Sequence, residues 1–117
     1  MSESQADCLF CRIVKKEVPS TEVLTSDHTY AFRDIHPAAP THVLVIPKEH
    51  IANAGELGHR HADLVAEMIA TAQEVARKEA IDGPGYRLVF NIGDHALNSV
   101  PHLHLHVLGG RQLGGMV

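Results

Sequence analysis

The sequence contains no apolar run long enough to cross a membrane. A membrane-spanning helix needs about 20 consecutive apolar residues, and every apolar stretch in this chain is much shorter. The first seven residues, MSESQAD, also lack the basic and apolar regions of a secretory signal peptide. We therefore expect a cytoplasmic protein that has no membrane partner.

Basic residues are scarce relative to acidic ones. Ten lysine and arginine residues stand against 14 aspartate and glutamate residues, and the net charge at pH 7 is -4 with neutral histidines. A protein that binds nucleic acid needs a basic stripe or patch to neutralise phosphates. We expect no nucleic-acid partner, and we expect any anionic substrate to be held locally by imidazoles and backbone amides.

Cysteine is also scarce, because the chain has only Cys8 and Cys11, in the arrangement C-x-x-C. Two cysteines cannot form a disulfide framework, and a thioredoxin-like redox site would need a preceding strand and a βαβ context that the polar N-terminus does not supply. Two interpretations remain at this point. The pair either binds a metal ion or consists of two reduced thiols packed in a short helix.

The length of 117 residues predicts one domain, residues 1–117, with residues 1–6 as an N-terminal extension and residues 109–117 as a C-terminal tail. A single core in a chain of this size buries about two-thirds of the surface of the unfolded chain. The resulting stability is modest, so association into a dimer would help.

The first part of the chain predicts a short helix and two strands. Apolar residues recur at three- and four-residue spacing over residues 7–17, which predicts an amphipathic helix with Asp7 as its cap and Pro19 just beyond its end. Residues 22–25 and 30–35 alternate in a way that predicts two strands of a sheet with one buried face.

The middle of the chain predicts a central strand and a long helix. Four consecutive apolar residues within residues 41–47 predict a strand that is buried on both faces. Residues 53–80 then predict one amphipathic helix that packs on the sheet. We expect His59, His61 and Asp63 to form a solvated first turn of this helix.

The segment HLHLHVL, residues 102–108, is the most distinctive part of the sequence. Alternate side chains of a strand point to opposite faces, so three imidazoles share one face at a spacing of about 6.6 Å. The apolar residues between them share the other face and predict a buried ladder. A histidine-rich strand can also be a solvated face or a metal-binding tract, but three histidines at period two backed by apolar residues favour a functional site.

Other polar residues stand where strands end. A strand at residues 86–91 and a loop at residues 93–99 precede the histidines, so Asn91 and Ser99 are placed to donate to an anionic group; loop asparagine and serine are also common for turn reasons alone. Asp34, at the end of residues 30–35, is expected to be solvated or to cap the following turn.

The HLHLHVL pattern resembles that of the histidine triad (HIT) superfamily. Ser99 and the sequence GGRQ at residues 109–112 resemble its Hint branch, the nucleoside phosphoramidases. The resemblance extends from Cys8 to Gln112. It implies an α+β fold in which an antiparallel sheet of about five strands carries one long helix and a short N-terminal helix, with two sheets joined across a homodimer.

The resemblance also implies an activity, the cleavage of the phosphorus-nitrogen bond of purine nucleoside 5′-phosphoramidates of the adenosine 5′-monophosphoramidate type. His104 is implied as the nucleophile that forms a covalent nucleotidyl-histidine intermediate, with its second ring nitrogen held by the backbone carbonyl of His102. His106 is implied to donate to the phosphoryl oxygens and Ser99 to pass a proton to the departing amine. His42, at the start of the central strand, is implied to support the triad; a core-edge histidine is the plain alternative.

The implied substrate contacts are spread over the chain. Asp34 corresponds to the acid that binds the ribose hydroxyls and Ile35 to a residue beside the base. The implied nucleotide-binding residues also include Asn91, Asn98, Ser99, His104 and His106. Phe10, Ile13 and Val18 are candidates for contact with the base, although packing explains apolar residues there equally well. The sequence departs from the family pattern at Leu97, where small residues or glycine are frequent, and at Asn98, where glutamine is usual.

Some members of the superfamily hold zinc with a cysteine pair, a histidine from the middle of the chain and the first histidine of the triad. Here that set is Cys8, Cys11, His50 and His102. Four such ligands leave no open position, so the implied zinc is structural. No organic cofactor is implied, and the chemistry of the triad itself needs no metal.

Two other functions remain open. The first is a dinucleoside polyphosphate hydrolase of the Fhit branch, although members of that branch carry glutamine in the region of Ser99 and lack the GGRQ tail. The second is a non-catalytic, zinc-stabilised nucleotide-binding or scaffold module. DNA-end-processing relatives need basic extensions that this chain lacks. Turnover of an adenosine phosphoramidate distinguishes these possibilities.

Overall fold

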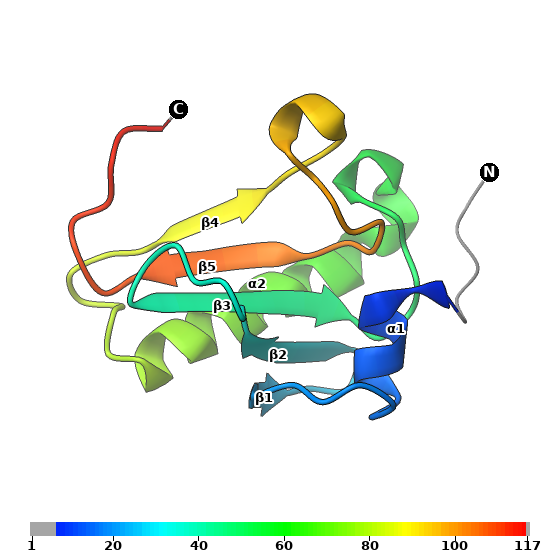
Figure 1. The fold of residues 1–117 in the computed structure, drawn as a ribbon, viewed down its shortest axis with the longest axis horizontal. Coiled ribbons are helices and arrows are strands. Elements are labelled where there is room, and N and C mark those ends of the chain that lie inside the picture. The colour runs from blue at the N-terminus through cyan, green and yellow to red at the C-terminus, as the bar shows by residue number, and fades with distance from the viewer. Residues whose placement is uncertain (1–6, 117) are drawn as a thin grey trace.

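The computed structural model describes residues 7–116, which form a five-stranded antiparallel sheet with one long helix on one face (Figure 1). The strands run in the spatial order β1-β2-β3-β5-β4. Their bounds are Glu22–Thr25 for β1, Thr29–Arg33 for β2, Thr41–Pro47 for β3, Arg87–Phe90 for β4 and Leu105–Gly109 for β5. The predicted α+β architecture is therefore confirmed. The predicted extension at residues 1–6 and residue 117 of the predicted tail lie outside the described residues.

The central strand β3 is buried along its whole length. It pairs with β2 on one side and with β5 on the other, so that Val43 lies opposite Arg33 and Val107. Both of its faces are covered, as the run of apolar residues predicts.

The strand β2 differs from its prediction in extent and burial. It spans Thr29–Arg33, and its first four residues are all buried rather than alternately exposed. Ala31 belongs to the core beneath the long helix, whereas Tyr30 and Phe32 belong to a second core on the opposite face. The prediction of one buried face was wrong because the N-terminal helix covers the other face.

That helix, α1, spans Leu9–Val14 and is shorter than the predicted 7–17. Cys8, not Asp7, is its N-cap, and the Cys8 Sγ accepts a hydrogen bond from the Cys11 amide at 3.4 Å. Lys16, with φ 64°, turns the chain out of the helical path. The helix buries Phe10 against the face of the sheet that carries the histidines.

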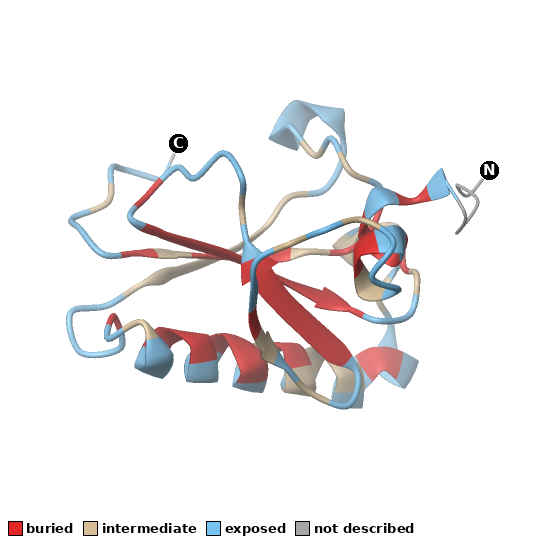
Figure 2. Cartoon of the chain, turned by 60° about the horizontal axis from the view of Figure 1, so that its bottom comes forward, coloured by how far each residue is buried: buried red, intermediate tan, exposed pale blue. Residues whose placement is uncertain are grey.

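The long helix α2 spans Ala62–Lys78 and packs its apolar side against the sheet, while its other side faces solvent (Figure 2). The predicted helix at 53–80 was too long, because two 3-10 turns, Ala54–Glu56 and His59–His61, precede α2. His61 is buried rather than solvated, and its Nδ1 accepts a hydrogen bond from the Gly58 amide at 2.9 Å. No helix within residues 7–116 combines the length and hydropathy that crossing a membrane requires.

The histidine segment joins the sheet later than predicted, because β5 begins at Leu105 rather than at His102. The amide of Leu103 donates to the Ile51 carbonyl at 2.6 Å, and the amide of His102 donates to the Val100 carbonyl at 2.9 Å. These bonds take the segment out of the strand ladder. Its side chains still alternate, because Leu103, Leu105 and Val107 all lie in the core beneath α2.

Candidate active site and metal cluster

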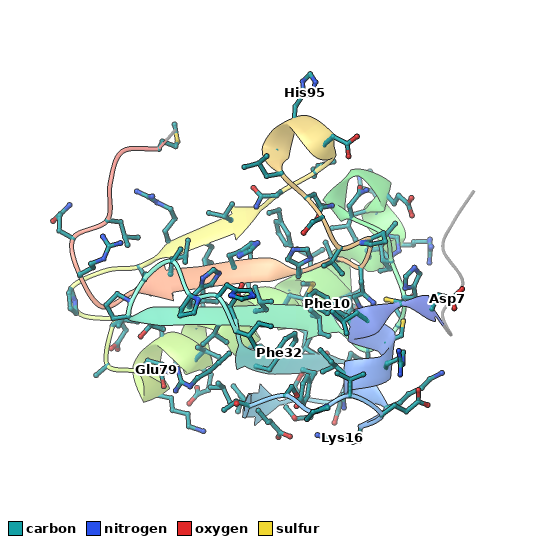
Figure 3. All side chains as sticks on the ribbon, viewed as in Figure 1. Asp7, Phe10, Lys16, Phe32, Glu79 and His95 are labelled. Carbon is teal, nitrogen blue, oxygen red and sulfur yellow. The ribbon has the colours of Figure 1, made fainter. Side chains whose placement is uncertain are left out.

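His104 and His106 lie side by side on the face of the sheet that carries α1. Their ring centroids are 5.0 Å apart. His106 is on β5 opposite Leu44 of β3, and His104 immediately precedes β5. Phe10 of α1 packs edge-on against the His104 ring at 5.3 Å between centroids. Figure 3 shows Phe10 between α1 and the sheet, with Phe32 beside it.

A backbone carbonyl determines the tautomer of His104. The His104 Nδ1 lies 2.7 Å from the His102 carbonyl oxygen, and because a carbonyl only accepts, Nδ1 is the donor. In the neutral ring the lone pair then belongs to Nε2. The contact expected between His104 and the carbonyl of His102 is therefore present in the structure, and it leaves the other ring nitrogen available as a nucleophile.

A second chain of hydrogen bonds determines the tautomers of His42 and His106. The Ala38 amide donates to His42 Nδ1 at 3.0 Å, so neutral His42 carries its proton on Nε2. The His42 Nε2 donates to His106 Nδ1 at 2.9 Å. The proton of His106 is consequently on Nε2, a buried nitrogen with no hydrogen-bond partner within residues 7–116. His42 thus contacts His106 and supports the pair from behind.

Burial keeps the rings of His42 and His106 neutral. The pKa of His106 is lowered to about 4, chiefly by burial and also by the neighbouring His104 and His42 rings, against the opposing effect of Asp34. Burial also lowers the pKa of His42 from its usual 6.5, against the attraction of the Asp34 carboxylate. A neutral His42 is what the Ala38 amide requires, since an imidazolium has no lone pair to accept a hydrogen bond.

A cleft of about 350 Å³ opens in front of the two histidines. It lies between α1, the segment that follows β2 and the loop that precedes β5. The predicted site residues that line it are Phe10, Ile13, Val18, Asp34, Ile35, Asn91, Ser99, His104 and His106. His42 lies behind His106 and does not line the cleft, nor does Asn98, whose Oδ1 is buried without a hydrogen-bond partner in the described part of the chain.

Asp34 takes part in a turn and faces the site at once. One carboxylate oxygen accepts a hydrogen bond from the His36 amide at 2.8 Å. The other lies 3.4 Å from His42 Nε2. The turn-capping alternative for Asp34 is thus confirmed, and the carboxylate also lines the cleft.

Phe32 and Leu44 are among the cleft residues that the sequence analysis missed. They lie opposite each other in the β2-β3 register, and Leu44 also lies opposite His106. The signal was present, because Leu44 is two residues after His42 and therefore shares its face of β3. The sequence pattern did not show that β2 pairs with β3, which is what brings Phe32 to the cleft.

The four predicted metal ligands come together at the N-terminus of α1. One ligand atom from each of Cys8, Cys11, His50 and His102 lies within 4.8 Å of the others. His102 Nδ1 is 3.2 Å from the Cys8 Sγ and 3.5 Å from the Cys11 Sγ, and His50 Nδ1 is 3.3 Å from the Cys11 Sγ. Usual zinc-ligand bond lengths in a tetrahedron separate sulfur from nitrogen by about 3.6 Å.

The hydrogen bonding of His102 also fits a metal ligand. Its Nε2 donates to the Pro47 carbonyl at 2.9 Å, which leaves the Nδ1 lone pair directed at the two thiols. Burial lowers the pKa of His102 to about 4, so the ring is neutral at pH 7. The donor set, its spacing and its protonation fit zinc.

Asp34, His42 and His106 form another cluster with ligand atoms within 4.8 Å of one another. The Ala38 amide excludes it as a metal site in this geometry, because His42 Nε2 carries the proton. A metal there would require His42 Nδ1 to take up a proton facing the Ala38 N-H. The hydrogen-bonded relay consists of the Ala38 amide, His42 and His106, and the Asp34 carboxylate lies 3.4 Å from His42 Nε2.

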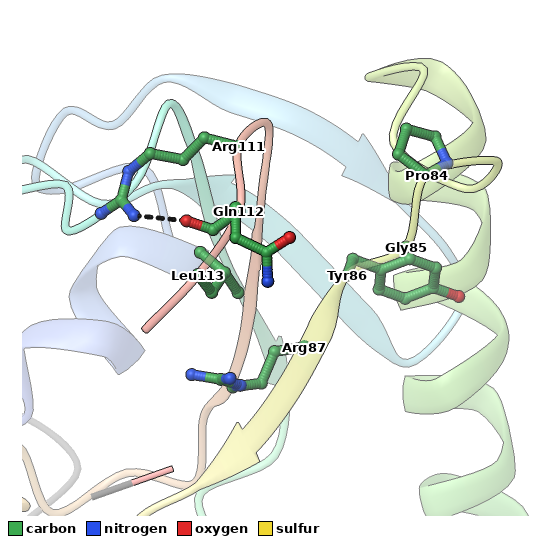
Figure 4. A pocket seen from close by; sticks show the side chains of 7 residues that line it. All are labelled: Pro84, Gly85, Tyr86, Arg87, Arg111, Gln112 and Leu113. Carbon is green, nitrogen blue, oxygen red and sulfur yellow. Dashed lines mark hydrogen bonds between the residues drawn. The ribbon is translucent and has the colours of Figure 1, made fainter. Parts of the chain in front are cut away.

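A smaller cavity of about 190 Å³ lies between the turn before β4 and the C-terminal tail (Figure 4). Its two guanidinium groups already have partners. Arg111 donates to the carbonyls of Gln112 and Ala38, and Arg87 donates to the Gly114 carbonyl. We assign these arginines to anchoring the tail.

Comparison with known proteins places this geometry among characterised relatives. Residues 7–115 match the family model described as scavenger mRNA decapping enzyme C-term binding. A purine nucleoside phosphoramidase of Escherichia coli K12 is 40% identical over 111 residues, which cover 95% of this chain and 93% of that protein. A 14 kDa zinc-binding protein of Zea mays is 42% identical over 107 residues, 90% of this chain and 83% of that protein. The solved structure of a HIT family hydrolase from Clostridium thermocellum superimposes with a TM-score of 0.93 at 43% identity, covering 97% of this chain and 99% of that one.

Proposed function

Because the chain belongs to the histidine triad family of nucleotide hydrolases, we propose that it cleaves the phosphorus-nitrogen bond of purine nucleoside 5′-phosphoramidates. The observation that carries the proposal is the pair of tautomers at the cleft. His104 offers a lone pair on Nε2, and His106, whose ring is 5.0 Å away, offers a proton on Nε2. A nucleophile beside a neutral donor suits attack on a phosphoryl group.

In the first step His104 Nε2 forms a bond to the phosphorus and the bond from phosphorus to the amine breaks. The amine takes its proton from Ser99, whose hydroxyl lies on the exposed loop that lines the cleft. The His106 Nε2-H donates to a nonbridging oxygen as charge develops on it. Removing one donor of this kind typically raises a barrier by about 2.7 to 4 kcal/mol.

In the second step water attacks the phosphorus and returns one proton to the Ser99 oxygen, and the bond to His104 Nε2 breaks, which releases the nucleoside monophosphate. Histidine suits both steps, because its neutral ring is a nucleophile near pH 7 and the phosphorylated ring is a good leaving group. The His102 carbonyl holds the Nδ1 proton throughout, so the same nitrogen that attacks is released.

The apolar part of the cleft suits a purine base. Phe10, Ile13 and Val18 line it from α1 and the segment that follows, and Ile35 lines it from the opposite side. Asp34 is assigned to the ribose hydroxyls, for which its carboxylate supplies acceptors. Asn91 and Ser99 are assigned to the phosphoryl group. Asn98 does not line the cleft and its amide donates to the Gly93 carbonyl at 3.1 Å, so we assign it no contact with the substrate.

The Cys8, Cys11, His50 and His102 cluster is assigned to zinc. A tetrahedral ion with these four ligands has no open position and supplies a structural cross-link rather than a reactive group. The ligand His102 also provides the carbonyl that orients His104.

We further propose that residues 1–117 act as one HIT domain that forms a homodimer. β4 is an edge strand of the sheet, and all four of its residues are only half-buried. An unpaired edge is a template for another strand, and pairing of β4 with a second copy extends the sheet across a two-fold axis. Light scattering that gives the mass of one chain at micromolar concentration contradicts this proposal.

The nucleophile is tested with an adenosine 5′-phosphoramidate and the variant His104→Ala. We expect turnover to fall below detection while binding of adenosine monophosphate remains measurable. His95→Ala is the matched control, because His95 lies on the same loop as Ser99 and points away from the sheet (Figure 3). Rapid quenching followed by mass spectrometry should locate a nucleotidyl group on His104. An adduct on another residue, or full activity in His104→Ala, rules out the mechanism.

A further inference from the structure

Leu97 is an unexpected residue for its position. It ends the 3-10 turn Asp94–Ala96 in the left-handed conformation, with φ 64° and ψ 31°, and its amide donates to the Asp94 carbonyl at 2.9 Å. Glycine and asparagine adopt this conformation most readily. The side chain is also 86% exposed. Neither the backbone nor burial favours a leucine here.

The other non-glycine residues in the left-handed conformation differ from Leu97 in their side chains. Among residues 7–116, the non-glycine residues with positive φ are Lys16, Ala80 and Leu97. Lys16 and Ala80 follow the ends of α1 and α2, and one is charged and the other small. Leu97 alone in this described group presents a large apolar side chain to solvent.

Leu97 lines the cleft together with Ser99, His104 and His106. Within the described residues, the large apolar side chains classed as exposed are Leu9, Ile35, Ile92, Leu97 and Met116. Leu9 and Ile35 line the same cleft. Most of the strongly exposed apolar surface of the described chain thus gathers at the mouth of one cavity, which marks it as a binding surface.

The geometry of the displacement at phosphorus places the departing amine at the mouth of the cleft. In a displacement at phosphorus the leaving group departs opposite the attacking atom. His104 attacks from the sheet at the floor of the cleft, so the amine departs outward. Ser99, which protonates the amine, is two residues from Leu97 on the same loop. A substituent on the amine therefore passes Leu97.

The charged groups around the cleft are already engaged. Asp34 is the sole carboxylate among the described lining residues, and its oxygens contact the His36 amide and the His42 ring. The Arg33 guanidinium donates two hydrogen bonds of 2.8 Å to Glu79. A charged substituent finds no uncommitted charged partner there, whereas an apolar one finds Leu97.

We propose that Leu97, with Leu9 on the rim, forms a subsite that selects phosphoramidates whose departing amine carries an aliphatic or aromatic substituent. The inference rests on the proposed function and specifies its leaving group. Bond formation and cleavage are unchanged: phosphorus exchanges the amine for His104 Nε2, and the amine leaves protonated and packed against Leu97.

The test compares kcat/KM for three adenosine 5′-phosphoramidates, with phenethylamine, ammonia and glycine as leaving groups. We expect the wild-type protein to prefer the phenethyl compound over both others. In Leu97→Asn, which suits the left-handed backbone but is polar, the ratio of phenethyl to unsubstituted kcat/KM should fall about tenfold. Leu97→Gly should lower the ratio equally, and Ile92→Ala, which removes an exposed apolar side chain outside the cleft, should leave it unchanged.

Thermal unfolding of both Leu97 variants checks that they fold, and their midpoints should equal or exceed that of the wild type because the backbone strain is relieved. A ratio that stays within twofold of wild type in both variants overturns the inference while the proposed function stands. The inference is also overturned if the Leu97 variants lose affinity for adenosine monophosphate by the same factor as the kcat/KM ratio falls, because that result would show that Leu97 contacts the nucleotide and not the amine. If the wild-type protein hydrolyses none of the three compounds, the proposed function itself fails.

Discussion

Backbone groups position the protons of the three imidazoles at the site. The His102 carbonyl accepts a hydrogen bond from His104 Nδ1. The Ala38 amide donates to His42 Nδ1, and His42 Nε2 in turn donates to His106 Nδ1. Backbone groups do not change their protonation, so the lone pair on His104 Nε2 and the proton on His106 Nε2 are in place before any substrate binds. This preorganisation avoids reorganisation of dipoles during the reaction.

The relay makes a prediction for His42, which lines no part of the cleft. His42→Ala removes the donor to His106 Nδ1, so the His106 proton is no longer confined to Nε2. Leaving a buried acceptor unpaired costs about 1 to 3 kcal/mol, and we expect kcat for the phosphoramidate to fall roughly 10- to 100-fold. His42→Gln, whose amide can donate, should recover part of the loss. Unchanged kcat in His42→Ala would show that the relay has no function.

The buried rings also predict how stability depends on pH. His106 has a folded pKa of about 4 and the folded pKa of His42 is lowered as well, whereas both titrate near 6.5 when unfolded. Between these values the unfolded chain binds more protons, so the free energy of unfolding decreases as pH falls from 6.5 towards 4. The slope is at most roughly 1.4 kcal/mol per pH unit for each ring, and less where solvent reaches His106.

Urea unfolding at a series of pH values measures this slope. His106→Asn removes one of the titrations in this window, to which His102 also contributes, and should make the curve shallower. His59→Ala, which removes an exposed histidine, is the control and should leave the slope unchanged. A wild-type curve that is flat from pH 6.5 to 4 would contradict the neutral, buried state of these rings.

At the scale of elements, the alternation of side chains along a strand was more predictable from the sequence than the pairing of strands and the docking of helices. The sequence predicts correctly that His104 and His106 share one face and that Leu105 and Val107 share the other, because this follows from strand geometry alone. The start of β5 at Leu105 was not predictable, since it depends on the bond from Leu103 to the distant Ile51 carbonyl. The burial of both faces of β2 likewise depends on where α1 docks.

The turn between β1 and β2 is attached to α2 by one carboxylate, Glu67. Its oxygens accept hydrogen bonds from the Ser26 hydroxyl, from the His28 amide at 2.7 Å and from the His28 ring at 2.8 Å. The Ser26 hydroxyl contributes most to lowering the pKa of Glu67 to about 2, followed by the His28 amide. The helical pattern at residues 53–80 did not predict this contact, which joins segments 39 residues or more apart.

We expect Glu67→Ala to lower the free energy of unfolding by about 1 kcal/mol, because the half-buried Ser26 hydroxyl and the exposed His28 amide lose a charged acceptor. The loss should be present at pH 7 and should disappear as pH falls from 4.5 towards 2, where Glu67 of the wild type becomes protonated. Glu74→Ala, which breaks an exposed pair with Arg77, is the matched control and should change stability by less than about 0.5 kcal/mol. Equal effects of the two variants would contradict the role assigned to Glu67.

At the scale of the whole molecule, the metal cluster joins three segments that are distant in the sequence. Cys8 and Cys11 belong to the start of α1, His50 follows β3, and His102 precedes β5. The cluster lies where the core around α1 meets the segment that carries the triad. The C-x-x-C spacing suggested a metal from the sequence, but only the fold shows that the pair reaches His50 and His102.

Loading with zinc should therefore stabilise the fold as a whole. A ligand that binds only the folded state at 100 times its Kd adds about 2.7 kcal/mol, which corresponds to a rise in Tm of roughly 10 °C for a domain of this size. We expect one zinc per chain by elemental analysis, and a chelator should lower Tm by this amount. His50→Ala removes one ligand and should abolish the response to both zinc and chelator. His59→Ala, a nearby exposed histidine, should retain it. If zinc neither binds stoichiometrically nor raises Tm, the four side chains are held by hydrogen bonds among thiols and imidazoles alone.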